Sequence, residues 1–196
     1  PSFFFLLLSF PYRLALRAPD LVDCVRFRVL VPSGPHCFSI QLVASRLIFL
    51  DITEKTPWCW QMRWLKYLLA HDSSKARILL IGHPPLHPDE NAPFDQKDDY
   101  LAPPEFRDAL LQTIEEHDVD RVFSANLSLY SEKTVGDTTF VTTGGAGGLV
   151  MNNDTSFYHY VRVNVGADGE LSHNLERLEG GPHPILKRQE STRLMI

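Results

Sequence analysis

One histidine stands where proteins commonly place reactive groups, at the end of a buried strand. His83 follows the continuous apolar run of residues 76–81, within the tetrapeptide Gly-His-Pro-Pro. An imidazole on such a loop can be held rigidly and still reach solvent or a metal, so His83 is a candidate metal ligand. A histidine that only bonds the loop backbone is the competing interpretation. His87 adds little, because the prolines between the two residues forbid the helix that would align them.

The loop after His83 is rich in acidic side chains. Its carboxylates belong to Asp89, Glu90, Asp95, Asp98 and Asp99. Carboxylates can gather a hard cation, but the loop lacks the spacing and the central glycine of an EF-hand. A solvated acidic loop is the simpler interpretation.

A glycine-rich run at residues 144–148 could offer backbone N–H groups to a phosphate. It lacks both the Lys-Ser/Thr pair of a P-loop and the G-x-G-x-x-G register, so we interpret it as a tight turn that lets the backbone approach a site. The sequence contains no G-x-S-x-G motif for a hydrolase serine. Its three cysteines are too scattered for a disulfide framework or a C-x-x-C zinc site.

Hydrophobic periodicity predicts the elements that position these groups. Residues 37–43 and 46–50 read as a strand hairpin, and 76–81 as a strand covered on both faces. Thr56-Pro57 is a helix start, followed by a core stripe of Trp58, Met62, Leu65 and Leu69. A second amphipathic helix at 105–117, a strand at 121–126 and a terminal hairpin about 166–169 complete the pattern. The fold class that follows is a layered α/β domain.

The strand that begins at Arg121 stops in an unexpected way. Its apolar character gives way to the polar corner Ala125-Asn126-Leu127-Ser128, and Leu129 then resumes it. Asn126 lies within an N-x-S pattern, and Asn153 within an N-x-T pattern. Glycosylation of these residues is an alternative interpretation that applies only in the secretory pathway.

Length and charge limit the classes of function. A chain of 196 residues with 44% hydrophobic residues can build one sizeable core. Its 24 acidic and 19 basic residues are scattered along the chain and give a net charge of -5. The sequence lacks the basic stripe that binding to a phosphate backbone requires, so we expect no nucleic-acid partner.

Composition divides the chain into three parts. Residues 1–33 form a hydrophobic N-terminal segment of uncertain role, 34–179 the folded domain, and 180–196 a loosely ordered tail. The apolar run at residues 3–10 is too short for a membrane span and lacks a preceding basic region. We interpret it as a buried or interfacial element. A cytoplasmic location is slightly favoured, with membrane contact through residues 3–10 as the alternative.

The order of motifs resembles the C-terminal half of calcineurin-like metallophosphoesterases. The resemblance covers about residues 34–178 and rests on the order LIFLD, QxxWL (Gln61, Trp64, Leu65), GHPP, VDRVFSxxLxLY, TTGGAGG and YHYVRV. It implies part of a four-layer α/β/β/α sandwich with a mixed sheet. It also implies hydrolysis of phosphate monoesters or diesters at a pair of divalent metals (Mn, Fe or Zn), which clamp the phosphate and generate a hydroxide.

Within that resemblance, two metal positions can be carried over. His83 matches the Gly-His element of the family, and Asn126 stands in the corner where the family has Gly-His-x-His. Asn offers a neutral oxygen and Ser a weak hydroxyl, and neither replaces two imidazoles on a transition metal. No residue is assigned a catalytic role. The carboxylate-bearing motifs of the family's N-terminal half, Asp-x-His, Gly-Asp-x-x-Asp and Gly-Asn-His-Asp/Glu, are absent from residues 1–36.

Two principal hypotheses for the function follow. The first is a metallophosphoesterase-like domain that is catalytically degenerate and acts as a binding or scaffold module. The second is an active phosphoesterase whose ligands come from another chain or from residues such as His36, Asp51 and Asn126. A third is a damaged or alternatively spliced product without activity. Half of a sandwich would leave a sheet edge exposed, so we expect a second copy or another partner chain to cover it.

Overall fold

The computed structural model describes residues 2–6, 13–16, 37–42, 44–51, 57–86, 103–145, 150 and 154–178. One set of strands comprises β3 (Phe38–Gln41), β4 (Ser45–Leu50), β5 (Ala76–Ile81), β6 (Arg121–Ser124), β7 (Tyr130–Val135) and β8 (Thr138–Thr143). A second set comprises β1 (Ser2–Leu6), β2 (Arg13–Leu16), β9 (His159–Val165) and β10 (Leu171–Arg177). The helices are α2 (Trp58–Ala70) and α3 (Pro104–Glu116).

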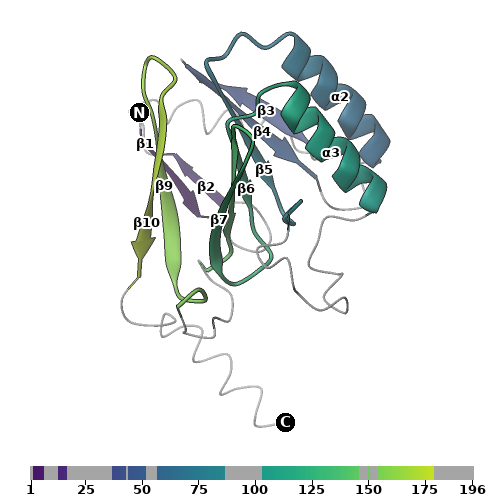
Figure 1. The fold of residues 1–196 in the computed structure, drawn as a ribbon. Helices are drawn as coiled ribbons and strands as arrows, with labels where there is room; N and C mark the ends of the chain where they lie inside the picture. Colours follow the sequence, from purple (N-terminus) through teal and green to yellow (C-terminus); the bar gives the residue numbers. More distant parts are fainter. Residues whose placement is uncertain are drawn as a thin grey trace.

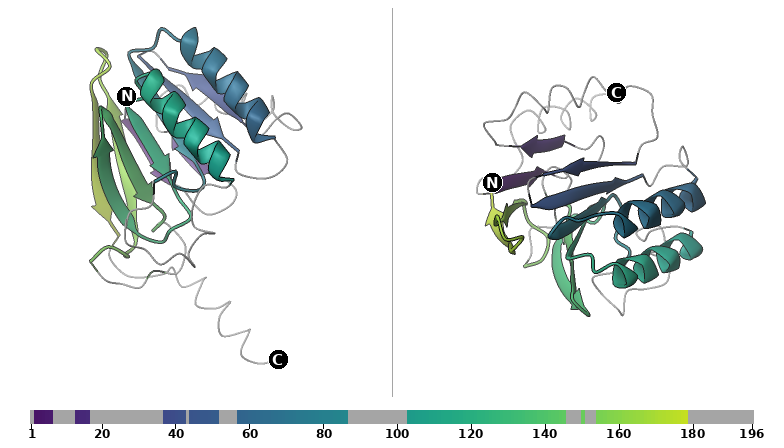
Figure 2. Two further views of the ribbon diagram at one scale, coloured as in Figure 1. Left: turned by 45° about the vertical axis from the view of Figure 1, so that its right-hand side comes forward. Right: turned by 90° about the horizontal axis from the view of Figure 1, so that it is seen from above.

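A six-stranded mixed sheet with the order β3-β4-β5-β6-β8-β7 forms the centre of the domain. Strands β4, β5, β6 and β8 are parallel, and β3 and β7 are antiparallel at the two edges. Helices α2 and α3 cover one face, and the four-stranded antiparallel sheet β10-β9-β1-β2 lies on the other side (Figures 1 and 2). The predicted layered α/β fold with a mixed sheet is therefore confirmed.

Residues 47–50 of β4 and 78–81 of β5 are all apolar because both faces of these strands are covered. Leu47 and Phe49 of β4 join the core between the two sheets, whereas Ile48 and Leu50 join the core beneath the helices. On β9, by contrast, Val161, Val163 and Val165 are buried and the residues between them are half-buried. Each fully buried aliphatic side chain contributes about 1.5–3 kcal/mol to folding. Burial in these two cores therefore holds the helices and the second sheet against the central sheet.

Most of the predicted elements are found close to their predicted positions. β3 and β4 form the expected antiparallel hairpin, and β9 and β10 form the expected terminal one. The buried face of α2 contains Met62, Leu65 and Leu69, as predicted, together with the polar Gln61, while Trp58 is half-buried. The helix begins at Trp58, one residue later than expected, with Pro57 as its N-cap.

The N-terminal segment contributes strands to the second sheet. β1 pairs with β9 on one side and with β2 on the other, both antiparallel. The rest of residues 1–33, the acidic loop with His87, and the tail at 180–196 lie outside the described residues. None of the helices that the structure describes is long and apolar enough to cross a membrane.

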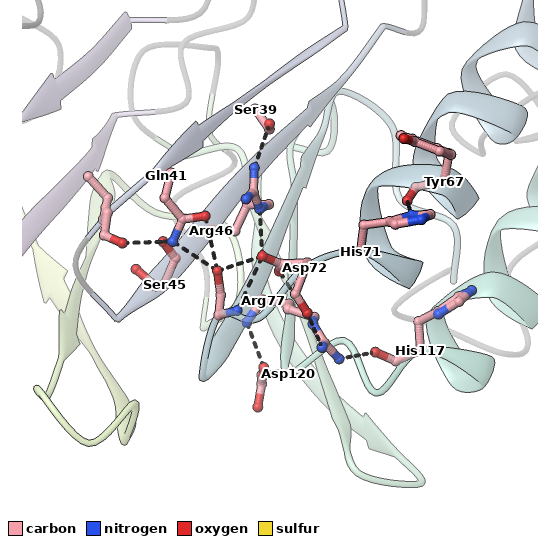
Figure 3. A network of polar contacts seen from close by, with 12 residues as sticks. Ser39, Gln41, Ser45, Arg46, Tyr67, His71, Asp72, Arg77, His117 and Asp120 are labelled. Atoms are coloured by element: carbon pink, nitrogen blue, oxygen red, sulfur yellow. Dashed lines mark hydrogen bonds and ion pairs between the residues drawn. The ribbon is translucent and has the colours of Figure 1, made fainter.

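A partly buried ion-pair network joins five elements at the amino-terminal end of the parallel strands (Figure 3). Arg46 of β4 donates from Nε to Asp72 Oδ1 at 2.8 Å, and Arg77 Nε of β5 lies 3.4 Å from Asp72 Oδ2. The guanidinium of Arg77 also donates to the carbonyl of His117 at the end of α3, at 2.7 Å. The Arg77 amide donates to Asp120 Oδ2, just before β6, at 2.7 Å.

Asp72, which follows α2, is the shared acceptor of this network, and its side chain is only 1% exposed. Burial by itself raises the pKa of this carboxyl. Hydrogen bonds from Arg46 and from the hydroxyl and amide of Ser74, together with the charge of Arg46, outweigh burial and lower the pKa below 3.8. The ionised carboxylate is therefore the form that the fold stabilises.

We expect Asp72→Asn to lower the free energy of unfolding by about 2 kcal/mol at pH 7, because two partly buried guanidinium groups lose their anion. The folded pKa lies below the unfolded one, so this contribution is complete above about pH 5 and fades as acid protonates the carboxylate. Urea unfolding at several pH values measures both effects.

Asp108→Asn is the matched control, since Asp108 pairs with its neighbour Arg107 at a site where its side chain is 67% exposed. Its effect should stay within about 0.5 kcal/mol. A gap between Asp72→Asn and the wild type that stays constant down to pH 2 would contradict the assigned ionisation.

Candidate functional site

The candidate site lies at the carboxyl-terminal ends of three adjacent parallel strands. Asp51 directly follows β4, His83 comes two residues after β5, and Asn126 comes two residues after β6. The pairing of Leu50 with Ile81 and of Ile81 with Ser124 brings these strand ends to one edge of the sheet. The structure thus assembles all three loops where ligands bind in open α/β sheets.

At the end of β4, the peptide groups of Asp51 are held by a buried glutamine from α2. The Gln61 side chain donates to the Asp51 carbonyl at 2.8 Å, and its oxygen accepts the Asp51 amide at 3.0 Å. Asp51 is 3% exposed and Gln61 is 1% exposed. This pair of hydrogen bonds between α2 and the end of β4 gives a structural reason for the glutamine of the QxxWL motif.

Cys37, just before β3, is buried near Asp51. Burial raises the pKa of its thiol, and the negative charge of Asp51 raises it further. The thiol therefore stays protonated at neutral pH, which makes Cys37 a poor nucleophile and a poor metal ligand.

The loop after β5 places His83 in a half-buried position. Its neighbouring glycine connects this loop to the next strand end, since the Gly82 carbonyl accepts the Ala125 amide at 3.2 Å. The backbone of the loop that carries His83 is therefore bonded to the corner that contains Asn126.

The corner after β6, at residues 125–129, consists of successive tight turns. Asn126 has a φ of 69°, a left-handed conformation that Asn tolerates better than most residues. The Leu127 amide donates to the Ala125 carbonyl at 2.9 Å, and the Leu129 amide to the Leu127 carbonyl at 2.8 Å. The strand stops here because the chain reverses into β7, which runs antiparallel to β8.

Glycines fix this corner against the end of β8. A Cβ atom on Gly144 would overlap the carbonyl of Leu127, and one on Gly145 would overlap the ring of His159 and the carbonyl of Phe157. The predicted close backbone approach is therefore present at these two glycines, where it serves packing between protein segments. Residues 146–149 lie outside the described residues.

His159, at the start of β9, is a fully buried histidine that sequence reasoning did not single out. Its Nδ1 lies 2.8 Å from the Phe157 carbonyl, and its Nε2 lies 3.1 Å from the Thr143 hydroxyl. Because a carbonyl only accepts, Nδ1 carries the proton and Nε2 accepts from Thr143. The alternation of His159 with the buried valines of β9 is the sequence signal that could have found it.

The environment of His159 favours the neutral ring. Burial lowers the pKa of His159 below 6.5, the bond to Phe157 opposes this, and the charge of Arg177 lowers the pKa further. The guanidinium of Arg177 lies 3.8 Å from the centre of the Phe157 ring, beside the imidazole. His159 is thus a packing and hydrogen-bonding residue at the edge of the candidate site.

The side chains at the ends of β4, β5 and β6 do not fit a two-metal centre. Among the described residues no group of three or more His, Cys, Asp or Glu side chains could hold a metal ion. His83 is the single imidazole on the loops after β4, β5 and β6 in that part of the chain, and Asn126 is exposed. Two metals need several anionic and imidazole ligands, and the described residues of this chain do not supply such a set.

We expect Gly144→Ala to destabilise the fold by about 2 kcal/mol, because its methyl group would displace the Leu127 carbonyl. Gly136→Asn is the control, since no atom lies within 4 Å of a Cβ at Gly136, and Asn tolerates its φ of 57°. Thermal unfolding of both variants measures the difference. Equal losses of thermal stability in the two variants would contradict a destabilising overlap between residue 144 and the Leu127 carbonyl.

The stability of the fold should also depend on pH through His159. Because its folded pKa is lowered, its contribution is complete above about pH 6.5 and declines as the pH falls, by at most about 1.4 kcal/mol per pH unit. His159→Gln cannot titrate, so its denaturation profile should be flatter between pH 7 and 5. The variant His71→Gln makes the same substitution at an exposed histidine and serves as the control.

Comparisons with known proteins agree with this architecture at the level of the fold. No family model and no curated protein matches the chain. Among solved structures, a purple acid phosphatase from yellow lupin (Lupinus luteus) seeds is similar, with 15% identity and a TM-score of 0.55. The match covers 72% of this chain and 30% of the phosphatase chain.

A putative 5'-nucleotidase from Staphylococcus aureus matches over 80% of this chain and 33% of its own, with 9% identity and a TM-score of 0.44. This chain therefore spans about a third of the length of each of these structures. At such low identities the similarity establishes the fold alone. The chain has a layered α/β fold with a mixed six-stranded sheet at its centre, similar to that of the purple acid phosphatase.

Proposed function

We propose that this chain is a metallophosphoesterase-like domain that is catalytically degenerate and acts as a binding or scaffold module. The observation that carries the proposal is the corner at residues 125–128. Where the resemblance implies two metal-binding histidines, this chain has Asn126 and Ser128. An amide and a hydroxyl are weak ligands for a transition metal.

The contacts of the corner support the same conclusion. The Ser128 carbonyl accepts a hydrogen bond from the Ser156 hydroxyl at 2.6 Å, and Gly144 packs against the Leu127 carbonyl. Backbone groups of this corner are thus engaged by other protein segments. The partner of such a module is proposed to cover a sheet edge. β3 is one such edge of the central sheet, since among the described strands it pairs only with β4.

The alternative is an active phosphomonoesterase or phosphodiesterase whose metal ligands are completed by another chain. The observation that favours it is the position of Asp51, His83 and Asn126 on the ends of three adjacent parallel strands. Here a pair of Mn, Fe or Zn ions would supply Lewis acidity and a bound hydroxide. His36, the other proposed ligand, lies outside the described residues.

Bound metal separates these two functions. We expect protein that is loaded with Mn²⁺ and Zn²⁺ and then dialysed to retain close to zero equivalents by elemental mass spectrometry. It should also fail to hydrolyse p-nitrophenyl phosphate and bis(p-nitrophenyl) phosphate above the rate of the buffer. His83→Ala should leave both results and the folded circular-dichroism spectrum unchanged.

Retention of about two equivalents per chain would contradict the proposal, provided that His83→Ala loses them and His71→Ala does not. His71 is a suitable control because it is exposed and bonds the Tyr67 carbonyl at 2.8 Å, after the carboxyl end of α2. Metal that is lost equally in both variants would indicate adventitious binding.

A further inference from the structure

The outer face of α2 presents an aromatic and basic stripe to solvent. Trp60 is 46% exposed, Tyr67 is 68% exposed, and Arg63 between them is also exposed. The three residues follow the i, i+3, i+7 spacing of one helical face, opposite the buried face of the helix. Aromatic residues and Arg are among the side chains most enriched at protein interfaces and at their energetic centres.

The outer face of α3 carries the opposite charge. Asp108, Gln112 and Glu115 are exposed and follow the i, i+4, i+7 spacing of one face, opposite the buried Phe106 and Leu110. Within the part of the chain that the structure describes, neither Arg63 nor Glu115 forms an ion pair. Both charges are therefore available to a partner.

The two helices lie side by side in one layer and run in the same direction (Figures 1 and 2). Near the amino-terminal ends of the two helices, the rings of Trp58 and Phe106 stack with their centroids 6.0 Å apart. Toward the carboxyl-terminal ends, Lys66 Nζ lies 4.0 Å from Glu116 Oε2. This register places Arg63 at a level between Asp108 and Glu115 of the neighbouring helix. The aromatic and basic stripe and the acidic stripe thus run in parallel at matching heights.

We propose that a second copy of this chain docks on this helical layer. A two-fold axis that runs parallel to both helices, above the layer and midway between them, places α2 of each copy over α3 of the other. Arg63 then lies between the partner subunit's Asp108 and the partner subunit's Glu115, and Trp60 and Tyr67 lose their exposure to water. A two-fold interface needs a self-complementary surface, and this layer supplies both halves of one.

The size of the surface predicts a weak dimer. Each helix of 13 residues is about 20 Å long, and packed helices are about 10 Å apart, so the layer offers roughly 400 Å² per subunit. This area is at the low end for specific interfaces, so we expect dissociation constants in the micromolar range or above. The interface is distinct from the sheet edge and goes beyond the proposed function.

Sedimentation velocity from about 10 to 500 µM should show a dimer whose fraction falls as the salt concentration rises, because ion pairs at the rim are screened. Arg63→Glu should raise the dissociation constant at least about tenfold, and adding Glu115→Arg to it should restore dimerisation. Trp60→Ser should weaken the dimer without introducing a charge. Lys75→Glu is the control, since Lys75 is exposed and donates to the Ala167 carbonyl beside the β9–β10 turn.

Tryptophan fluorescence gives an independent measurement, because the three tryptophans of the chain all lie in α2. The emission of the wild type should shift to shorter wavelength as the concentration rises, and that of Arg63→Glu should not. A monomer at all concentrations in low salt would overturn the proposal. So would a dimer that Arg63→Glu leaves unchanged, or one that the double variant does not restore.

Another occupant of this face would also overturn it. Binding of monomers to anionic lipid vesicles, abolished by Arg63→Glu, would make the stripe on α2 a membrane contact. The acidic stripe on α3 disfavours that outcome, because an anionic surface would repel it.

Discussion

The requirement to bury both faces of the parallel strands governs this structure. Strands β4 and β5 carry apolar side chains on both sides, so each needs a layer of protein above and below it. The helices supply one layer and the strand pair β9–β10 supplies the other. Since the central strands are parallel, their carboxyl ends meet at one edge, and this geometry creates the candidate site whether or not its residues can bind a metal.

The two ends of the sheet use polar groups in different ways. At the amino-terminal end, Asp72 gathers two arginines and secures the connections between helices and strands. At the carboxyl-terminal end, Gln61 holds the peptide groups of Asp51, and the tight turns around Asn126 pack against Gly144. The hydrogen bonds of Gln61 and of the backbone groups at this second end join it to other parts of the protein, as a structural corner requires.

A domain whose described residues supply few metal ligands can still contribute through its surfaces. The sheet edge at β3 and the outer faces of α2 and α3 lie on different sides of the molecule from the strand ends that carry His83 (Figures 1 and 2). The proposed association through these surfaces and the proposed loss of catalysis are therefore independent of each other. The charges of the two helices, basic on α2 and acidic on α3, allow one chain to supply both sides of an interface.

The sequence by itself determined the layered α/β class, most of the elements between residues 37 and 177 and the three strand ends that carry Asp51, His83 and Asn126, because hydrophobic periodicity and turn residues are local signals. It did not predict β7, nor the place of β1 and β2 in the second sheet. Only the tertiary structure decided how the polar groups are used. The pairing of Gln61 with Asp51, the bonds of His159 and the exposure of Trp60 depend on segments that are distant in the sequence. Periodicity identifies which face of an element is apolar. It does not identify which partner satisfies a buried amide or imidazole, and that partner decides whether a residue serves packing or chemistry.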